Sequence, residues 1–401
     1  MNLKNEAQSA FKDTRDFYRE YVSGMSRKSI SKDIQADSER IKQLYREAVE
    51  AEQVQEPGKK VSGVQKFFRF FLAMTKRLNP TRRLIFGLAC ISFVAHYLFA
   101  LLGLSGYFLH PLFLPLAFFG IVIILLIELL EKTDVKRELD LARDIQLSLL
   151  PSTEFTNRHL EIYSFANTAQ EVGGDYIDVI RSKEGTYVVV ADVSGKGLSA
   201  ALYMVRFQAL VHLLIKKHQP SPKQLFLELN NYVKSNKGDK TFITACAAWF
   251  PDHEQTFTFA RAGHNTPIVY NKENDTIYHL KSGGLALGMA PSQILRHQLQ
   301  EKTYHFKQGD SMLIYTDGLT EARNELGREY GEDELDNLMA IYGSLRAKSI
   351  SLKVQSSLEA FMGSNRPHDD ITFAVVHNIG PQQIVPAETA EEADVSEETL
   401  S

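Results

Sequence analysis

Two long apolar segments precede a series of short β-rich runs and amphipathic helices along this chain. Residues 84–104 are almost wholly apolar, and a second apolar run covers residues 112–130, with Pro115 inside it and Glu128 near its end. Each run is close to the roughly 20 residues that a transmembrane helix needs. The pattern over residues 84–130 therefore predicts a transmembrane hairpin with a very short connection. A buried helix pair in a soluble domain is the alternative.

Basic residues flank this hairpin on both sides. They are Lys76, Arg77, Arg82 and Arg83 before it, and Lys132, Lys136, Arg137 and Arg143 after it. Because basic flanks stay on the cytoplasmic side of a membrane, both ends of the hairpin are expected there. The sequence thus predicts a multi-pass protein of the inner (cytoplasmic) membrane, in contact with membrane lipid, with its C-terminal domain in the cytoplasm.

The segment before the hairpin divides into two parts. Residues 1–60 are polar and helix-prone, and a Pro57-Gly58 break follows their helical pattern. Residues 61–83 alternate Phe and Leu with Lys and Arg, which is typical of an amphipathic helix lying at a lipid surface. A helix packed within a soluble domain is the alternative for this second part.

A charged helix is predicted directly after the hairpin, over residues 131–150. Its apolar positions recur every three or four residues and are Val135, Leu139, Ala142, Ile145 and Leu149. This spacing suits either a short homodimer seam or packing against the chain's own C-terminal domain. Both alternatives stay open at this stage.

Residues 151–378 have the pattern of an α+β domain. Apolar β-rich runs at residues 160–166, 187–192, 242–250, 256–261, 267–270 and 277–280 predict strands. Amphipathic runs at residues 199–217, 222–233, 332–342 and 351–362 predict helices. Several consecutive strands with helical insertions favour a layered α+β fold. Residues 379–401 are acidic and rich in Ala, Ser and Pro, and we expect them to be a disordered tail.

Composition excludes two classes of protein. The chain has 401 residues and a formal net charge of −4, so it offers no general basis for binding nucleic acid. Its two cysteines, Cys90 and Cys246, imply neither a disulfide framework nor a zinc site.

Four aspartates stand at or beside the ends of predicted strands. Asp175 begins one strand, Asp192 ends another, Asp317 follows a third, and Asp369 precedes the last. Each one taken alone is more often a turn residue, because Asp hydrogen-bonds its own backbone. Taken together they predict a carboxylate cluster with no matching Arg or Lys. Such a cluster needs a cation, and hard oxygen ligands suit Mn²⁺ or Mg²⁺.

Five motifs, four of which contain these aspartates, occur in one order. After Ala142-Arg143-Asp144-Ile145-Gln146 and Leu149-Leu150-Pro151 come GGDYID, ADVSGKG, RAGHN, YTDGLTEA and HDDIT. This order resembles the SpoIIE/RsbU-like branch of the metal-dependent protein phosphatases (PPM, the protein phosphatase 2C type). The resemblance covers roughly residues 138–377. It implies a layered β-sandwich flanked by helices, two divalent cations (Mn²⁺ or Mg²⁺), and hydrolysis of phosphoserine or phosphothreonine.

The resemblance also implies roles for individual residues. Asp175 and Asp192 are expected to act as shared metal ligands at the catalytic centre, joined by the carbonyl of Val193, and Asp317 and Asp369 complete one metal. The remaining candidates are His264 as a proton donor, with a structural role as its alternative, and Asp178, Lys196 and Asp370 in a supporting position. The expected substrate is a phosphorylated regulatory protein, typically of sigma-factor partner switching.

Two other functions compete with this interpretation. The tripeptide GGD also opens the diguanylate cyclase signature, but Tyr176 and Ile177 replace the residues expected there. A catalytically inactive, phosphatase-like membrane scaffold would be favoured by the loss of any of the four strand-end aspartates, and all four are present.

Overall fold

The computed structural model describes residues 42, 71, 75, 76, 78–103, 110–234 and 241–381. The chain forms two compact units, Met1–Thr133 and Asp134–Ser401. Apart from residue 42, the segment predicted for residues 1–60 lies outside the described residues, as do most of the segment predicted for residues 61–83 and the tail beyond residue 381.

Two apolar helices pair in the first unit. Helix α4 (Pro80–Leu101) lies against the first part of α5 (His110–Ser148). Arg82 donates to Glu128 at 2.8 Å and to Glu131, and the rings of Phe99 and Phe113 are 5.4 Å apart. Contacts at both ends of the pair show that the two helices run antiparallel, as a hairpin.

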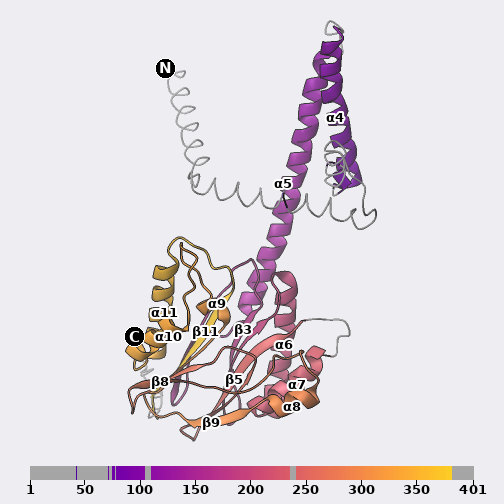
Figure 1. Ribbon diagram of the computed structural model, residues 1–401. Helices are drawn as coiled ribbons and strands as arrows, with labels where there is room; N and C mark the ends of the chain where they lie inside the picture. Colours follow the sequence, from indigo (N-terminus) through magenta and orange to yellow (C-terminus); the bar gives the residue numbers. More distant parts are fainter. Residues whose placement is uncertain are drawn as a thin grey trace, which may run out of the picture. The chain divides into compact units, whose positions relative to one another are not determined.

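Helix α5 contains both the second predicted span and the predicted linker helix. The span at residues 112–130 and the linker at residues 131–150 form one continuous helix of 39 residues (Figure 1). Nothing between them stops a helix, since Glu131-Lys132-Thr133-Asp134 contains neither Gly nor Pro.

Three helices in the described residues are long and apolar enough to cross a membrane: α4, α5 and α6 (Leu198–His218). The apolar windows of α4 and α5 are only 11% and 6% buried, whereas that of α6 is 44% buried. Met204, Phe207 and Val211 of α6 belong to the core of the second unit. Helix α6 is therefore apolar because it covers a sheet.

The second unit contains two antiparallel sheets. The six-stranded sheet has the order β1-β2-β11-β10-β7-β8, and the five-stranded sheet has the order β3-β4-β5-β6-β9. The first sheet consists of β1 (Glu154–Thr156), β2 (Leu160–Asn167), β7 (Ile268–Asn271), β8 (Thr276–His279), β10 (Ser311–Tyr315) and β11 (Ile371–Asn378). The second consists of β3 (Asp175–Arg181), β4 (Gly185–Val193), β5 (Ile243–Pro251), β6 (Thr256–Ala262) and β9 (Glu301–His305).

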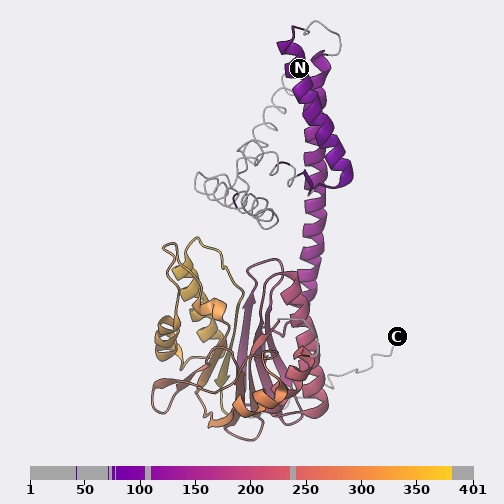
Figure 2. The ribbon, with the colours of Figure 1, turned by 45° about the vertical axis from the view of Figure 1, so that its right-hand side comes forward.

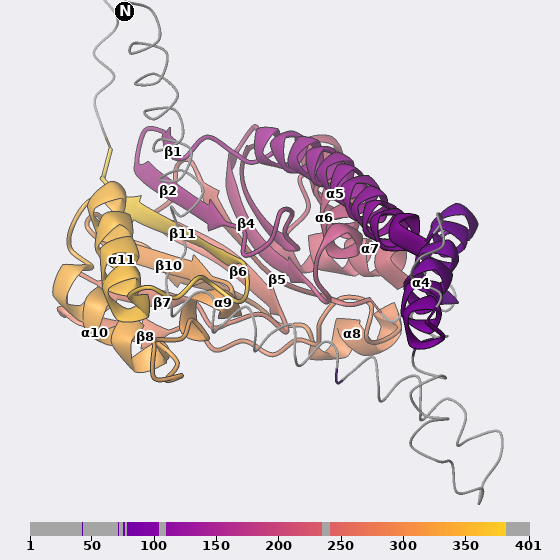
Figure 3. The same cartoon turned by 90° about the horizontal axis from the view of Figure 1, so that it is seen from above.

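Helices cover the outer face of each sheet (Figures 2 and 3). Helices α6 and α7 (Pro222–Lys234) pack on the five-stranded sheet, and α10 (Glu332–Tyr342) and α11 (Ala347–Met362) pack on the six-stranded sheet. Two short helices, α8 (Ser292–Gln298) and α9 (Asp317–Thr320), complete the unit. This α+β sandwich flanked by helices confirms the predicted fold class.

Strand alternation separates three hydrophobic clusters. In β4, Tyr187, Val189 and Ala191 face α6, while Val188 and Val190 face the other sheet. Successive side chains of a strand point to opposite faces, so the next residue, Asp192, lies on the same face as Val190, between the sheets. The polar end of β4 is thereby directed toward the edge of the inter-sheet core.

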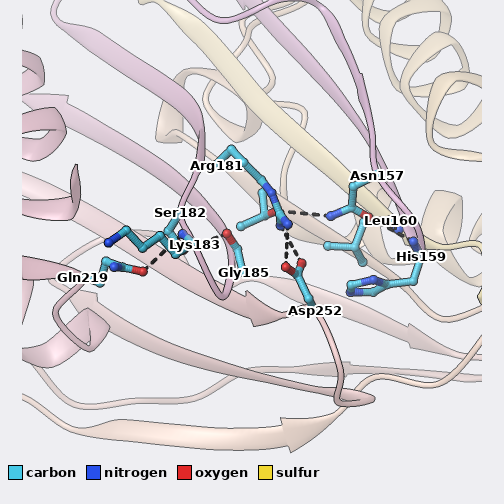
Figure 4. A network of polar contacts seen from close by, with 10 residues as sticks. Asn157, His159, Leu160, Arg181, Ser182, Lys183, Gly185, Gln219 and Asp252 are labelled. Carbon is cyan, nitrogen blue, oxygen red and sulfur yellow. Dashed lines mark hydrogen bonds and ion pairs between the residues drawn. The ribbon is translucent and has the colours of Figure 1, made fainter.

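A polar network joins the two sheets at the opposite end of β3 (Figure 4). Arg181 binds the carboxylate of Asp252 with two N–H groups and also donates to Thr186. Asn157, which follows β1, donates to the same Thr186 hydroxyl at 3.2 Å. These contacts hold β1, β3 and β4 together far from the strand end that carries Asp175.

Candidate active site

Asp175 and Asp192 face each other directly across β3 and β4. The register pairs Asp175 with Asp192, and Ile177 with Val190. Both aspartates lie on the inter-sheet face, where Ile177 and Val190 belong to the same core cluster. Like charges directly opposite each other destabilise a sheet, so this pair is a cost to the fold unless a cation or a proton compensates it.

The six-stranded sheet brings a second group of acids to the same place. β10 ends at Tyr315 and β11 begins at Ile371, so Asp317 and Asp370 sit at neighbouring strand ends. Thr316 donates its hydroxyl to Asp175 at 2.8 Å and accepts the N–H of Thr372 at 3.1 Å. This threonine therefore joins the two sheets at the site.

Asp370 fixes the loop before β3. Its two carboxylate oxygens accept the N–H groups of Ala169 at 2.8 Å and Gly174 at 2.7 Å. A Cβ at Gly173 would lie 2.4 Å from the Asp370 carboxylate, and one at Gly318 would lie 1.9 Å from the Asp370 carbonyl. Only glycine fits either position, which explains part of the GGD and TDG motifs.

The carboxylates raise one another's pKa values. Burial, followed by the charges of Asp317, Asp369 and Asp370, raises the pKa of Asp192 to about 7. Burial and the charge of Asp192 raise the pKa of Asp175 well above its ordinary value. Burial also raises the pKa values of Asp317 and Asp370. These shifts mark a crowded site with too little positive charge.

This donor set fits divalent cations that keep part of their water shell. In the described part of the chain, no three His, Cys, Asp or Glu side chains converge closely enough to ligate one ion directly. Mg²⁺ commonly binds through one or two carboxylates and several waters, so such convergence is not required. The main chain of Val193 passes beside Gly174, since Val193 N lies 3.4 Å from the Gly174 carbonyl oxygen.

Lys196 forms an ion pair with one of the acids. Its Nζ lies 2.7 Å from Asp369 Oδ2 and donates to the His368 carbonyl at 3.0 Å. The same side chain lines a pocket with Asp192, Asp369 and Asp370. The structure thus brings six of the candidate positions together: Asp175, Asp192, Lys196, Asp317, Asp369 and Asp370.

His264 does not suit the proton-donor role considered for it. The side chain is 2% exposed, and its Nδ1 lies 2.9 Å from the Thr244 hydroxyl. Burial, with the nearby charge of Arg261, lowers its pKa to about 3. An enclosed imidazole with such a low pKa is neutral near pH 7 and is a poor general acid, because only the imidazolium form gives up a proton readily. The geometry corresponds to the structural alternative.

Asp178 lies away from the acid cluster. Because it is three residues after Asp175, it points to the opposite face of β3, toward α6. There its carboxylate accepts the Tyr176 hydroxyl at 2.9 Å and contacts His212 Nε2. Asp178 ties β3 to α6 and is a structural residue.

Sequence reasoning missed two contributors. Thr316 has no role of its own within the YTDGLTEA motif, and Gln146 has none within the motif Ala142-Arg143-Asp144-Ile145-Gln146. Gln146 is 5% exposed; its amide N–H donates to the Gly173 carbonyl at 2.7 Å and its oxygen accepts the Gly173 N–H at 3.1 Å. A polar residue in line with Leu139 and Ala142 was the available signal for Gln146.

Known proteins share this domain. Residues 182–378 match the family model described as Stage II sporulation protein E (SpoIIE). The phosphoserine phosphatase RsbU of Bacillus subtilis is 29% identical over 243 residues, which cover 61% of this chain and 70% of RsbU. Protein IcfG of Synechocystis is 24% identical over 60% of this chain and 41% of its own length.

One solved structure supports the fold. The SiaA-PP2C domain of Pseudomonas aeruginosa superposes with a TM-score of 0.54 at 19% identity, over 62% of this chain and 98% of that domain. The match to SpoIIE, the similarity to RsbU and the shared fold all agree with the family indicated by the order of the sequence motifs. The acid cluster at the end of the sandwich agrees with it as well. The C-terminal part of the chain is a protein serine/threonine phosphatase domain similar to the SpoIIE/RsbU-like branch of the metal-dependent (PPM) phosphatases.

Proposed function

We propose that this protein is a membrane-anchored, metal-dependent phosphatase that removes phosphate from phosphoserine or phosphothreonine on a cytoplasmic regulatory protein. The observation that carries the proposal is the Asp175–Asp192 pair, placed face to face across β3 and β4. Two carboxylates this close repel each other unless a cation binds them, and three further carboxylates lie near the pair.

The proposed ligands come from both sheets. Asp175, Asp192 and the Val193 carbonyl would hold Mn²⁺ or Mg²⁺ from the five-stranded sheet, and Asp317 and Asp369 from the ends of β10 and β11. Two such cations would supply an activated water and would neutralise charge on the phosphoryl group.

Other residues keep these ligands in place. Thr316 holds the Asp175 carboxylate by its hydrogen bond, and Asp370 holds the loop at Ala169 and Gly174. A ligand whose orientation is fixed before the substrate arrives loses less entropy in the reaction.

The substrate class follows from the relatives. RsbU is named a phosphoserine phosphatase and matches over most of its own length. A phosphorylated protein of sigma-factor partner switching, or of a related signalling pathway, is therefore the proposed substrate. Membrane anchoring is supported by α4 and α5, whose apolar windows leave most side chains uncovered.

The test is hydrolysis of a generic aryl phosphate by the purified full chain, with and without Mn²⁺, beside Asp192→Asn. We expect Mn²⁺-dependent turnover in the wild type and at least a hundredfold loss in the variant, which should remain folded because a repulsive charge is removed. Wild-type protein that binds Mn²⁺ but never turns over would favour the alternative, an inactive phosphatase-like scaffold.

A further inference from the structure

Lys196 occupies an unusual position among the acids. It lies between Gly195 and Gly197 in the loop that follows β4, directly after the strand end that carries Asp192. Its ammonium contacts Oδ2 of Asp369, just before β11, at 2.7 Å. The contact joins the two sides of the site, 173 residues apart in sequence.

Lys196 carries the local positive charge. Within the described residues, it is the one Lys or Arg side chain that forms an ion pair with any of the clustered aspartates. The hydrogen bond to Asp369 raises the pKa of Lys196, so the side chain keeps its proton at physiological pH. The charge of Lys196 also opposes the rise in the pKa of Asp192.

The proposed metal ion would compete with Lys196 for the Asp369 carboxylate. Asp369 belongs to the proposed ligand set, and a carboxylate oxygen held at 2.7 Å by an ammonium has less charge to offer a metal ion. An ammonium and a divalent cation placed beside the same carboxylate also repel each other. The Lys196 ammonium and a divalent cation therefore cannot both bind Asp369 with full affinity.

We propose that Lys196 is a displaceable counter-ion of Asp369, which competes with the divalent cation and sets the cation concentration at which the phosphatase becomes loaded. The inference rests on the proposed function, because it assigns a role toward that metal centre. Half of the Lys196 side chain and a third of Asp369 are exposed, so the pair has the strength of a surface ion pair. Such a pair corresponds to an affinity change of about two- to fivefold.

A thermodynamic cycle makes the competition measurable. If a cation must displace Lys196, then removing Lys196 weakens the metal-free protein and tightens cation binding by the same factor. Replacement by Arg keeps the positive charge and restores most of the competition. A charge removed elsewhere, as in Lys217→Gln at the exposed end of α6, should change neither quantity.

The experiment uses the full chain in four forms: wild type, Lys196→Gln, Lys196→Arg and Lys217→Gln. Mn²⁺ binding is measured by calorimetry, and unfolding is measured with chelator and with saturating Mn²⁺. We expect Lys196→Gln to bind Mn²⁺ about two- to fivefold more tightly and to unfold more easily only in chelator. Lys196→Arg and Lys217→Gln should resemble the wild type.

Three results would overturn the inference. They are an unchanged Mn²⁺ affinity in Lys196→Gln, an unchanged stability of that variant in chelator, or an equal gain of affinity in Lys217→Gln. Failure of the wild type to bind Mn²⁺ at all is a different outcome, because it would remove the proposed metal centre itself.

Discussion

Single residues determine the chemistry of this site, and their neighbours decide which of them take part. Asp175 and Asp192 could be recognised from their motifs because each stands where a strand meets a glycine-rich turn. His264 was a candidate proton donor with a structural role as its alternative, and the motif RAGHN does not reveal burial, which decides between the two. The structure separates the two cases: the aspartates line the end of the inter-sheet core, and the histidine is enclosed.

His264 gives a prediction about acid stability. The folded chain holds His264 neutral with a pKa lowered to about 3, whereas an unfolded histidine takes up its proton near pH 6.5. The stability that this group contributes is therefore present above pH 6.5 and is lost as pH falls toward 3. Between pH 7.5 and 5.0 the contribution of His264 alone should fall by about 2 kcal/mol. The raised pKa of Asp192 acts in the opposite direction over the same range, so the His264 effect is read from the difference between wild type and variant.

The variant to compare with the wild type is His264→Gln. His253→Gln, at an exposed position, is the control. Urea unfolding at the two pH values should show that, on going from pH 7.5 to 5.0, the unfolding free energy of His264→Gln changes more favourably than that of the wild type by about 2 kcal/mol. His253→Gln should show the wild-type change. Activity of His264→Gln should far exceed that of Asp192→Asn. An equal collapse of activity would restore His264 as the proton donor.

Long helices and buried strands were easier to predict than short edge strands. The helix at Glu332–Tyr342 has the predicted bounds, and β4 was recognised from its uncharged β-branched run. β1 and β9 were missed because their sequences, Glu154–Thr156 and Glu301–His305, are short and polar. Such edge strands gain their place from pairing with neighbours, which local sequence does not encode.

The last turns of α5 illustrate what periodicity leaves out. Leu139 and Ala142 are half-buried and Gln146 is buried, whereas Val135 and Ile145 are exposed. One face therefore packs on the phosphatase domain, as the second alternative for residues 131–150 required. A homodimer through the exposed face remains a prediction.

Gln146 gives a prediction about this helix. Gln146→Leu keeps most of the side-chain volume but leaves the buried N–H and carbonyl of Gly173 without their partners, which should cost about 1–3 kcal/mol. Because Gly174 and Asp175 follow directly, Mn²⁺ affinity should fall as well. Ser148→Ala, an exposed change on the same helix, is the matched control.

Thermal unfolding and calorimetric Mn²⁺ titration of the two variants check this expectation. If Gln146→Leu loses stability yet binds Mn²⁺ like the wild type, the helix end supports the fold without influencing the metal site. If neither the thermal stability nor the Mn²⁺ affinity changes, the hydrogen bonds to Gly173 contribute no measurable free energy.

At the scale of the whole molecule, charge and hydropathy predict a topology. The hairpin of α4 and α5 has cytoplasmic-type basic flanks, and Arg82 pairs with Glu128 and Glu131 at its base. We therefore expect the domain after α5 to remain in the cytoplasm.

A reporter enzyme that is active only outside the cytoplasm, fused after Glu131, should be silent. The same reporter fused after Leu102, beyond α4, should be active. The reverse pattern would overturn the predicted orientation, and two silent fusions would argue against any membrane crossing.

The number of Mn²⁺ ions bound by the purified chain tests the central claim most directly, because the account makes the acid cluster a two-metal phosphatase centre. Calorimetric titration should show two Mn²⁺ ions for the wild type, and Asp192→Asn should lose at least one of them, since Asp192 is a proposed shared ligand. A wild-type chain that binds no Mn²⁺, or a variant that binds the same number with the same affinity, would contradict the account.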